Sequence, residues 1–257
     1  MTDAPVLSLT DVTVAFGGLK AVNQVSLSLM RGERRAVLGP NGAGKTTLFN
    51  AIAGATRPTS GRVVFDNIDI TRMSPQRRAH LGVARTFQIT NLFGQLTVLE
   101  NMRLAARGLA WSKFSLFGGD RLGAEQMAQV EAALAASQLA GRERVIVREM
   151  SYGEQRQLEV AMALVGQPRL LLLDEPAAGL SPAERGHLAA IVRALPRDLT
   201  VVLIEHDMDL ALGLVDSVTV MQNGRVIVES TPDKIRSDPL VQEVYLGKPH
   251  RVGEAVA

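Results

Sequence analysis

The most specific pattern in this 257-residue chain is AVLGPNGAGKTTLFNAIAG, residues 36–54. Gly39–Thr46 within it matches the phosphate-loop pattern G-x-x-x-x-G-K-[ST] in full, between an apolar strand pattern and a helical pattern. The glycines of such a loop let backbone N–H groups wrap phosphates, the lysine reaches the terminal phosphates, and the hydroxyl is placed to hold Mg²⁺. The pattern therefore predicts a nucleotide-phosphate site formed by Gly39, Pro40, Asn41, Gly42, Ala43, Gly44, Lys45, Thr46 and Thr47.

Two further apolar runs end in residues that suit phosphate chemistry. LLLLDE closes with Asp174 and Glu175, and TVVLIEH closes with His206. As central strands of a parallel sheet, both runs would release these side chains at the edge that also carries Lys45. Asp174 is then placed to hold a metal and Glu175 to polarise the attacking water, and His206 can donate a hydrogen bond to the γ-phosphate.

The alternation of such runs with helical patterns predicts an α/β fold with a mostly parallel central sheet. LSLTDVTVAF alternates about a break at Thr10 and Asp11, and GRVVFDNIDI reads as a strand pair, so we also expect an antiparallel β subdomain. SVTVMQNGRVIVE predicts a hairpin that turns at Asn223 and Gly224. From about 90 to 165, stretches rich in Ala, Leu, Glu and Gln predict a helical subdomain.

The amino-acid composition and charge of the chain limit which kinds of partner it can bind. The net charge is +2 and basic residues are scattered among nearly as many acids, which argues against a nucleic-acid-binding face. The chain has no cysteine, so a disulfide or a Cys-based zinc site is excluded. The N-terminus lacks the pattern of a signal peptide, and no apolar stretch approaches the ~20 residues needed to span a bilayer. A role at a membrane would therefore require a partner.

Three segments have the form of a capping box, in which paired side chains satisfy N–H groups at a helix start. They begin at Thr97, Ser151 and Ser181, and each has a glutamate three residues later. The helix that follows Ser151 offers a second anion site at its N-terminus, although the phosphate loop already has its own helix. A capping box by itself indicates only where a helix starts.

The order and spacing of these motifs resemble the nucleotide-binding subunits of ABC transporters, across almost the whole chain. The resemblance implies a P-loop NTPase fold with a single ATP-binding domain, residues 1–250, and a flexible tail, residues 248–257. Within the domain, a RecA-like core is expected at about 1–89 and 166–235, with the helical subdomain at about 90–165. ATP and Mg²⁺ are the implied ligands.

The resemblance also implies roles for single residues. Phe16 corresponds to an aromatic that stacks on adenine, and Asp174 shares the metal with Thr46 and Gln88. Glu175 corresponds to the catalytic base and His206 to a switch at the γ-phosphate. Gln88 joins these catalytic residues, in a loop that senses both Mg²⁺ and the membrane partner.

In that family the signature helix start faces the γ-phosphate held by a second subunit, so ATP closes a head-to-tail dimer. The corresponding signature residues are Ser151, Tyr152, Gly153, Glu154 and Gln155. Tyr152 stands where the common LSGGQ signature has its first glycine. In the loop of residues 178–181, which passes across the dimer, Ser181 replaces the aspartate of many members.

FGGLKAVNQVSL, RTFQITNLFGQLTVLEN, DEPAAGLSP and IEHDM together look like the ATPases of branched-chain amino-acid importers. That likeness implies a second ATPase subunit, two transmembrane permease subunits, a periplasmic solute-binding protein that acts indirectly, and a peripheral location on the cytoplasmic face of the inner membrane. A heterodimer is expected, although a homodimer is possible. Trp111, Phe114 and Phe117 fall at helical spacing in a segment that either touches the membrane subunit or lipid headgroups, or packs onto the helical subdomain.

Other functions fit parts of the pattern. Importers of urea or short amides share the FGG start and the EHDM end, and exporters of lipopolysaccharide share a YLG-like tail. A DNA-repair ATPase would need a long coiled-coil insertion that is not present between the phosphate loop and the signature. A small-molecule kinase would not need the SYGEQ helix.

Overall fold

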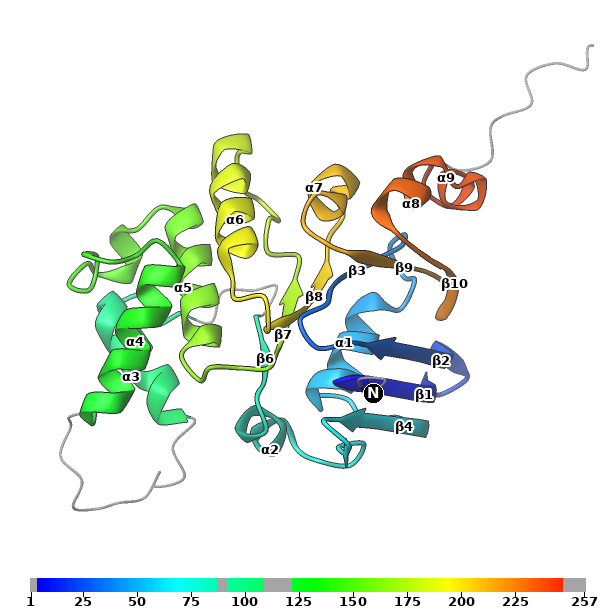
Figure 1. Ribbon diagram of the computed structural model, residues 1–257, viewed down its shortest axis with the longest axis horizontal. Helices are drawn as coiled ribbons and strands as arrows, with labels where there is room; N and C mark the ends of the chain where they lie inside the picture. Colours follow the sequence, from blue (N-terminus) through cyan, green and yellow to red (C-terminus); the bar gives the residue numbers. More distant parts are fainter. Residues whose placement is uncertain (1–3, 87–91, 109–121, 247–257) are drawn as a thin grey trace, which may run out of the picture.

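A computed structural model describes residues 4–86, 92–108 and 122–246 of the chain (Figure 1). Gln88, the three aromatics of the 108–123 segment and the predicted tail at 248–257 lie outside these residues. Within the described ranges, no helix is both long enough and apolar enough to cross a membrane.

Within the described residues, the central sheet has six strands in the order β10-β9-β3-β8-β7-β6. Their bounds are β3 Arg34–Leu38, β6 Val83–Arg85, β7 Leu170–Asp174, β8 Thr200–Ile204, β9 Ser217–Gln222 and β10 Arg225–Ser230. The pairs among β3, β6, β7, β8 and β9 are parallel, and β10 pairs antiparallel with β9. Asn223 and Gly224 join β9 to β10 with φ of 50° and 76°, the left-handed geometry of the predicted hairpin turn. The mostly parallel sheet predicted from the apolar runs is confirmed.

A second, antiparallel sheet has the order β2-β1-β4-β5. It comprises β1 Leu7–Phe16, β2 Leu19–Leu29, β4 Ser60–Phe65 and β5 Ile68–Asp69. The expected break at Thr10 and Asp11 is a bulge within one continuous strand, where the register shifts and Asp11 has φ 48°. The Ser26 hydroxyl accepts the Asp11 N–H at 3.0 Å, so the displaced backbone donor stays satisfied.

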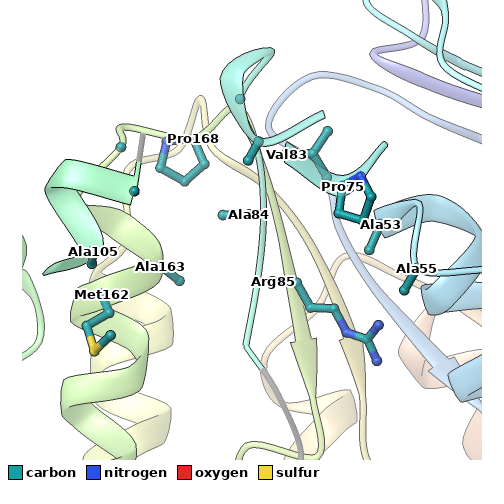
Figure 2. A pocket seen from close by; sticks show the side chains of 14 residues that line it. Ala53, Ala55, Pro75, Val83, Ala84, Arg85, Ala105, Met162, Ala163 and Pro168 are labelled. Atoms are coloured by element: carbon teal, nitrogen blue, oxygen red, sulfur yellow. The ribbon is translucent and has the colours of Figure 1, made fainter. Parts of the chain in front are cut away.

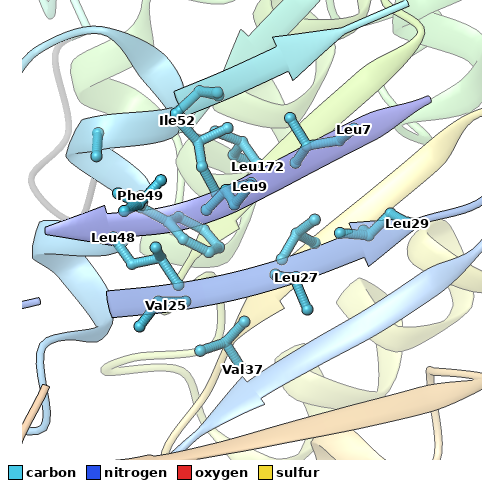
Figure 3. Packing of buried hydrophobic residues seen from close by; sticks show 14 of the residues in the cluster. Leu7, Leu9, Val25, Leu27, Leu29, Val37, Leu48, Phe49, Ile52 and Leu172 are labelled. Carbon is cyan, nitrogen blue, oxygen red and sulfur yellow. The ribbon is translucent and has the colours of Figure 1, made fainter. Parts of the chain in front are cut away.

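Helix α1, Lys45–Ala53, lies between the two sheets (Figure 3). Its apolar residues, Leu48, Phe49 and Ile52 among them, pack against β1 and β2 on one side and against Val37 and Leu172 of the central sheet on the other. Helix α2, Pro75–His80, follows the antiparallel sheet and is capped by Ser74, whose hydroxyl accepts from the Arg77 N–H. The helix that carries the phosphate loop is therefore held by both sheets.

In the part of the chain that the structure describes, helices α5 to α9 supply residues that pack on the opposite face of the central sheet (Figure 1). These are α5 Tyr152–Leu164, α6 Pro182–Ala194, α7 Met208–Leu212, α8 Pro232–Ser237 and α9 Pro239–Leu246. Alternate strand residues face them, such as Leu38, Leu171 and Leu203, while the residues between face α1. This alternation, with both faces buried, explains why the strands read as continuous apolar runs.

A third cluster of buried side chains joins α5 to α3, Val98–Gly108, and α4, Ala124–Ala136. The short 3₁₀ helix Val147–Glu149 leads into α5 and adds Val147 to the same cluster. Helix α5 packs on both this cluster and the central sheet, because Leu158 contacts the former and Val160 the latter. Contacts with two separate hydrophobic clusters therefore position α5.

Candidate nucleotide-binding site

The phosphate loop connects β3 to α1 through three glycines in the left-handed region. Gly39, Gly42 and Gly44 have φ of 148°, 79° and 100°. A Cβ on Gly39 would lie 2.2 Å from the Met221 carbonyl oxygen, and one on Gly44 would lie 2.2 Å from that of Ala21. Backbone conformation and close packing both require glycine at these two positions, which fixes the path of the loop.

Lys45 is buried, and its side chain bends back across the loop. Nζ donates to the carbonyl oxygens of Gly39 at 2.7 Å and Pro40 at 3.0 Å. Burial lowers the pKa of Lys45, while the carboxylates of Glu175 and Asp174 act in the opposite direction. The ammonium group therefore lies within electrostatic reach of both acids, as expected from the shared sheet edge.

The start of α1 is built to receive an anion. Among the described residues no side chain caps it, and its first turn contains no acidic residue. By contrast, α5 and α6 each begin with a capping glutamate. The free N–H groups and the positive end of the helix dipole at Lys45–Thr47 favour phosphate oxygens.

Asp174 ends β7 with its side chain almost fully buried, 1% exposed. Arg85, at the end of β6, donates to Oδ2 at 2.7 Å and also to Oδ1 of Asn50 at 2.5 Å. Oδ1 of Asp174 has no hydrogen-bond partner among the described residues. A buried carboxylate oxygen left in this condition fits a role as a ligand of Mg²⁺ or of a water on it, because Mg²⁺ prefers carboxylate oxygens and usually keeps several waters.

Glu175 follows with φ 48°, a left-handed conformation that is uncommon for a residue with a side chain. Its N–H donates to the Ile204 carbonyl oxygen at 2.9 Å, which ties the end of β7 to β8. Nε2 of His206 lies 2.5 Å from Oε1 of Glu175. The predicted base and the predicted γ-phosphate switch therefore meet directly.

Glu205 was not singled out from the sequence, although it precedes His206 in TVVLIEH. Its carboxylate accepts the N–H groups of Ala177 at 2.8 Å and His206 at 3.2 Å. Burial raises the pKa of Glu205, and the nearby Glu175 acts in the same direction. This side chain fixes the backbone of the loop after Glu175 to the backbone that carries His206. The available signal was an acid directly after a buried strand.

Ser151 caps α5 as predicted, accepting the Glu154 N–H at 3.2 Å. The Glu154 carboxylate in turn accepts the Ser151 N–H, and it also forms an ion pair with Arg142. Gln155 donates to the Met150 carbonyl oxygen at 3.2 Å, while Tyr152 is 41% exposed. The predicted capping boxes at Thr97 and Ser181 are also confirmed.

Phe16, the predicted adenine partner, ends β1 with 55% of its surface exposed. The phosphate loop leads into α1, and the signature leads into α5. These two helices pack on opposite faces of the central sheet. Buried residues of α1 belong to the cluster shared with the antiparallel sheet, whereas Val160 of α5 belongs to the cluster on the opposite face of the central sheet and Leu158 and Ala161 to the cluster with α3 and α4. The structure therefore brings together Lys45, Asp174, Glu175 and His206 but places α5 on the far face of the sheet.

A mostly apolar hollow of about 380 Å³ lies beside β6 (Figure 2). β6 forms one wall, with the end of α1 and α2 on one side and α3 and α5 on the other. Arg85 lines this hollow and also holds Asp174, so the hollow adjoins the proposed metal ligand through one side chain.

A complete phosphate loop, a strand-end carboxylate pair and a mostly parallel sheet define a P-loop nucleotide-binding protein. The pattern of the family described as ABC transporter matches residues 22–178. The chain belongs to the ABC transporter family, as one of its ATP-binding proteins.

Similar proteins cover the chain almost completely. It is 39% identical over 253 residues to the high-affinity branched-chain amino acid transport ATP-binding protein LivG of Escherichia coli, an alignment that covers 95% of this chain and 98% of that protein. Identity to the corresponding protein BraF of Pseudomonas aeruginosa is 38%, with the same coverage of both chains.

Solved structures agree with these relatives. A nucleotide-free ATP-binding cassette from an ABC transporter superposes with a TM-score of 0.83 at 31% identity, covering 95% of this chain and 100% of that one. A cassette in its ADP conformation gives the same TM-score and identity, covering 95% of this chain and 99% of that one. The expected ABC ATPase fold is confirmed.

Proposed function

We propose that this chain is the ATP-binding and ATP-hydrolysing subunit of an importer for branched-chain amino acids, and that it works by ATP-driven closure of a head-to-tail dimer. The ABC ATPase family and the near full-length likeness to LivG and BraF support this reading. Urea or short-amide import is the alternative, since the ATPase does not contact the solute and constrains it only by resemblance.

The placement of α1 and α5 on opposite faces of the central sheet carries the dimer proposal. Because the phosphate loop leads into α1 and the signature leads into α5, we infer that the chain's own signature does not enclose a γ-phosphate at Lys45. The signature of a second ATPase subunit can complete the site, and a head-to-tail pair completes two such sites at once. Each preorganised donor to the transferring phosphate contributes roughly 3 kcal/mol of barrier lowering.

Within one site, the geometry supports the roles given to Lys45, Asp174, Glu175 and His206, and the resemblance to the family supports those given to Phe16, Thr46 and Gln88. Lys45 and the N–H groups of Gly39–Thr47 hold the phosphates, and Phe16 stacks on adenine. Thr46 and Asp174 would hold Mg²⁺, together with Gln88, which the structure does not describe. Bound Mg²⁺ would neutralise charge on the phosphates.

Glu175 accepts a proton from the attacking water, and the contact with His206 orients its carboxylate. His206 is 47% exposed, so its imidazole is free to turn toward a γ-phosphate on the solvent side. Glu205 holds the two backbones that carry this pair.

Partners follow from the same proposal. A second ATPase subunit, two permease subunits and, indirectly, a periplasmic solute-binding protein complete the importer, with the ATPases on the cytoplasmic face of the membrane. We place the permease contact at the hollow beside β6, because an occupant there would touch Arg85 and thereby act on Asp174. The Trp111, Phe114 and Phe117 segment remains a second candidate contact.

The first test is uptake of labelled leucine and, in parallel, labelled urea by cells whose native chain carries Glu175→Gln. We expect leucine uptake alone to be lost, because the base is removed while nucleotide binding is kept. Loss of urea uptake alone would replace the amino-acid assignment with the amide alternative. Survival of both would contradict the importer proposal, and Glu100→Gln serves as a control outside the site.

A further inference from the structure

A carboxylate of the same chain already binds the start of the signature helix. The Gly153 N–H donates to Oε1 of Glu184 at 3.1 Å. Oε2 of the same glutamate accepts from the N–H of Ser181 at 2.9 Å and from its hydroxyl at 2.7 Å. One side chain of α6 therefore joins the starts of α5 and α6, which lie side by side (Figure 1).

The absence of a side chain at Gly153 makes this contact possible. A Cβ there would lie 2.6 Å from Oε1, 2.9 Å from Cγ and 3.0 Å from Cδ of Glu184, and these are its three nearest neighbours. A second contact lies just before α6, because a Cβ on Gly179 would lie 3.1 Å from Cε1 of Tyr152. The signature start is thus packed against α6 through Glu184 and against the loop of residues 178–181 through Gly179.

Tyr152 is itself held in place. Its hydroxyl accepts from Nη2 of Arg156 at 2.8 Å, and the Arg156 guanidinium lies over its ring at 5.2 Å from the centroid. Tyr152, which stands where the common signature has its first glycine, is therefore held in position next to Gly153 by Arg156.

Glu184 is an acceptor of the same chemical kind as a phosphate. Hydrogen bonds from the Ser181 side chain and backbone, and then from Gly153, lower its pKa, so it is negatively charged at neutral pH. A helix N-terminus stabilises an anion and offers charge-assisted N–H bonds to a carboxylate or to a phosphate. The two anions cannot both occupy the Gly153 donor, and they repel each other at that distance.

We propose that Glu184 is an internal stand-in for the γ-phosphate of the partner subunit, holding the Gly153 N–H until ATP displaces it. The inference rests on the proposed role of the signature in a head-to-tail dimer. Glu184 is a positioning residue that does not touch the reacting atoms. It raises the ATP concentration needed for closure, and it retakes the amide once phosphate leaves, which favours separated subunits.

The test uses the full chain in a Glu175→Gln background, with dimer formation measured by sedimentation over a titration of ATP. Glu184→Ala should lower the ATP concentration for half-maximal dimer by roughly three- to tenfold, the equivalent of one exposed hydrogen bond. Glu184→Gln keeps an acceptor without the charge and should give a smaller decrease. Glu100→Ala removes the equivalent glutamate of the α3 capping box, 2.7 Å from the Thr97 N–H, and should leave the titration unchanged.

Hydrogen exchange at the Gly153 amide gives a readout that does not depend on dimer formation. Exchange should accelerate in Glu184→Ala but not in Glu100→Ala, with comparable thermal unfolding of both variants. Faster exchange without a lower ATP requirement would overturn the inference while leaving the dimer proposal intact. Failure of every variant, including Glu175→Gln alone, to dimerise with ATP would instead contradict the dimer proposal and this inference together.

Discussion

At the scale of single residues, the site depends on acids whose surroundings differ sharply. Asp174 is paired with Arg85, Glu175 meets His206, and Glu205 is buried against backbone N–H groups. Three carboxylates near the same sheet edge therefore have three different partners. This separation allows one acid to hold a metal, one to accept a proton and one to fix the backbone.

Glu205 gives a prediction about pH. Because burial and the neighbouring Glu175 raise its pKa in the folded chain, with His206 acting against them, its contribution to stability is present below the ordinary glutamate pKa and is lost as pH rises through the folded value. Glu205→Gln stays neutral and keeps an acceptor for the Ala177 N–H. As pH rises from the ordinary glutamate pKa through the raised pKa of Glu205, we expect the free energy of unfolding of Glu205→Gln to increase relative to that of the native chain.

Denaturant unfolding at a series of pH values checks this, with Glu131→Gln on the exposed side of α4 to report the loss of one surface carboxylate. A constant difference between the Glu205→Gln and native chains at every pH would show that the buried charge has no energetic consequence.

At the scale of elements, α1 is anchored at its C-terminal end by a buried arginine. Nη1 of Arg78 donates to the carbonyl oxygens of Ala51 and Ile52 at 2.5 and 2.6 Å, and Nε and Nη2 donate to those of Met73 and Thr71. Burial lowers its pKa to about 10, so it remains charged at neutral pH. The cation thus satisfies the last carbonyls of the helix and complements the negative end of its dipole.

Replacing Arg78 by Met should cost about 3 kcal/mol of unfolding free energy or more, because several buried carbonyl groups lose their donor. Arg77→Met, on the exposed side of the same helix, should change stability by about 0.5 kcal/mol or less. Equilibrium denaturation measures the free energy of unfolding of the two variants. Equal decreases would show that the contacts of Arg78 with α1 contribute no more to stability than a surface arginine does.

Local signals predicted the elements and the caps, because periodicity, glycines and capping boxes act over a few residues. Arg78, Arg85 and Glu205 were missed as structural residues, and Glu184 was predicted as a cap of α6 but not as a partner of α5. Arg78 and Arg85 reach α1 and β7, and Glu184 reaches α5, all distant in sequence, so no local pattern records these contacts. The bulge at Asp11 was predicted as a break between strands, since its stabilising partner Ser26 lies on another strand. Gln88 stays a prediction.

At the scale of the whole molecule, the proposed closure is tested by mixing two inactive chains. Lys45→Met loses phosphate binding but keeps a complete signature, and Ser151→Ala keeps the phosphate loop but loses a signature donor. In a head-to-tail pair, one composite site of the mixed dimer is native. Phosphate release should return to about a quarter of the native rate, because random pairing gives half mixed dimers with one of two sites intact.

Each variant assayed alone supplies the baseline for this mixture. Recovery that is absent at any mixing ratio would mean that each chain completes its own site, against the placement of α1 and α5.

The separation of α1 and α5 across the central sheet has a further consequence for regulation. If neither subunit can enclose its own nucleotide, one closed site requires one nucleotide and two chains, and closure of both sites requires two nucleotides and two chains together. Closure then varies with the square of nucleotide occupancy, so a modest fall in cellular ATP has a larger effect on the fraction of closed pairs. The placement of two helices on one sheet would therefore make the fraction of closed pairs depend on ATP concentration more steeply than the occupancy of a single binding site does.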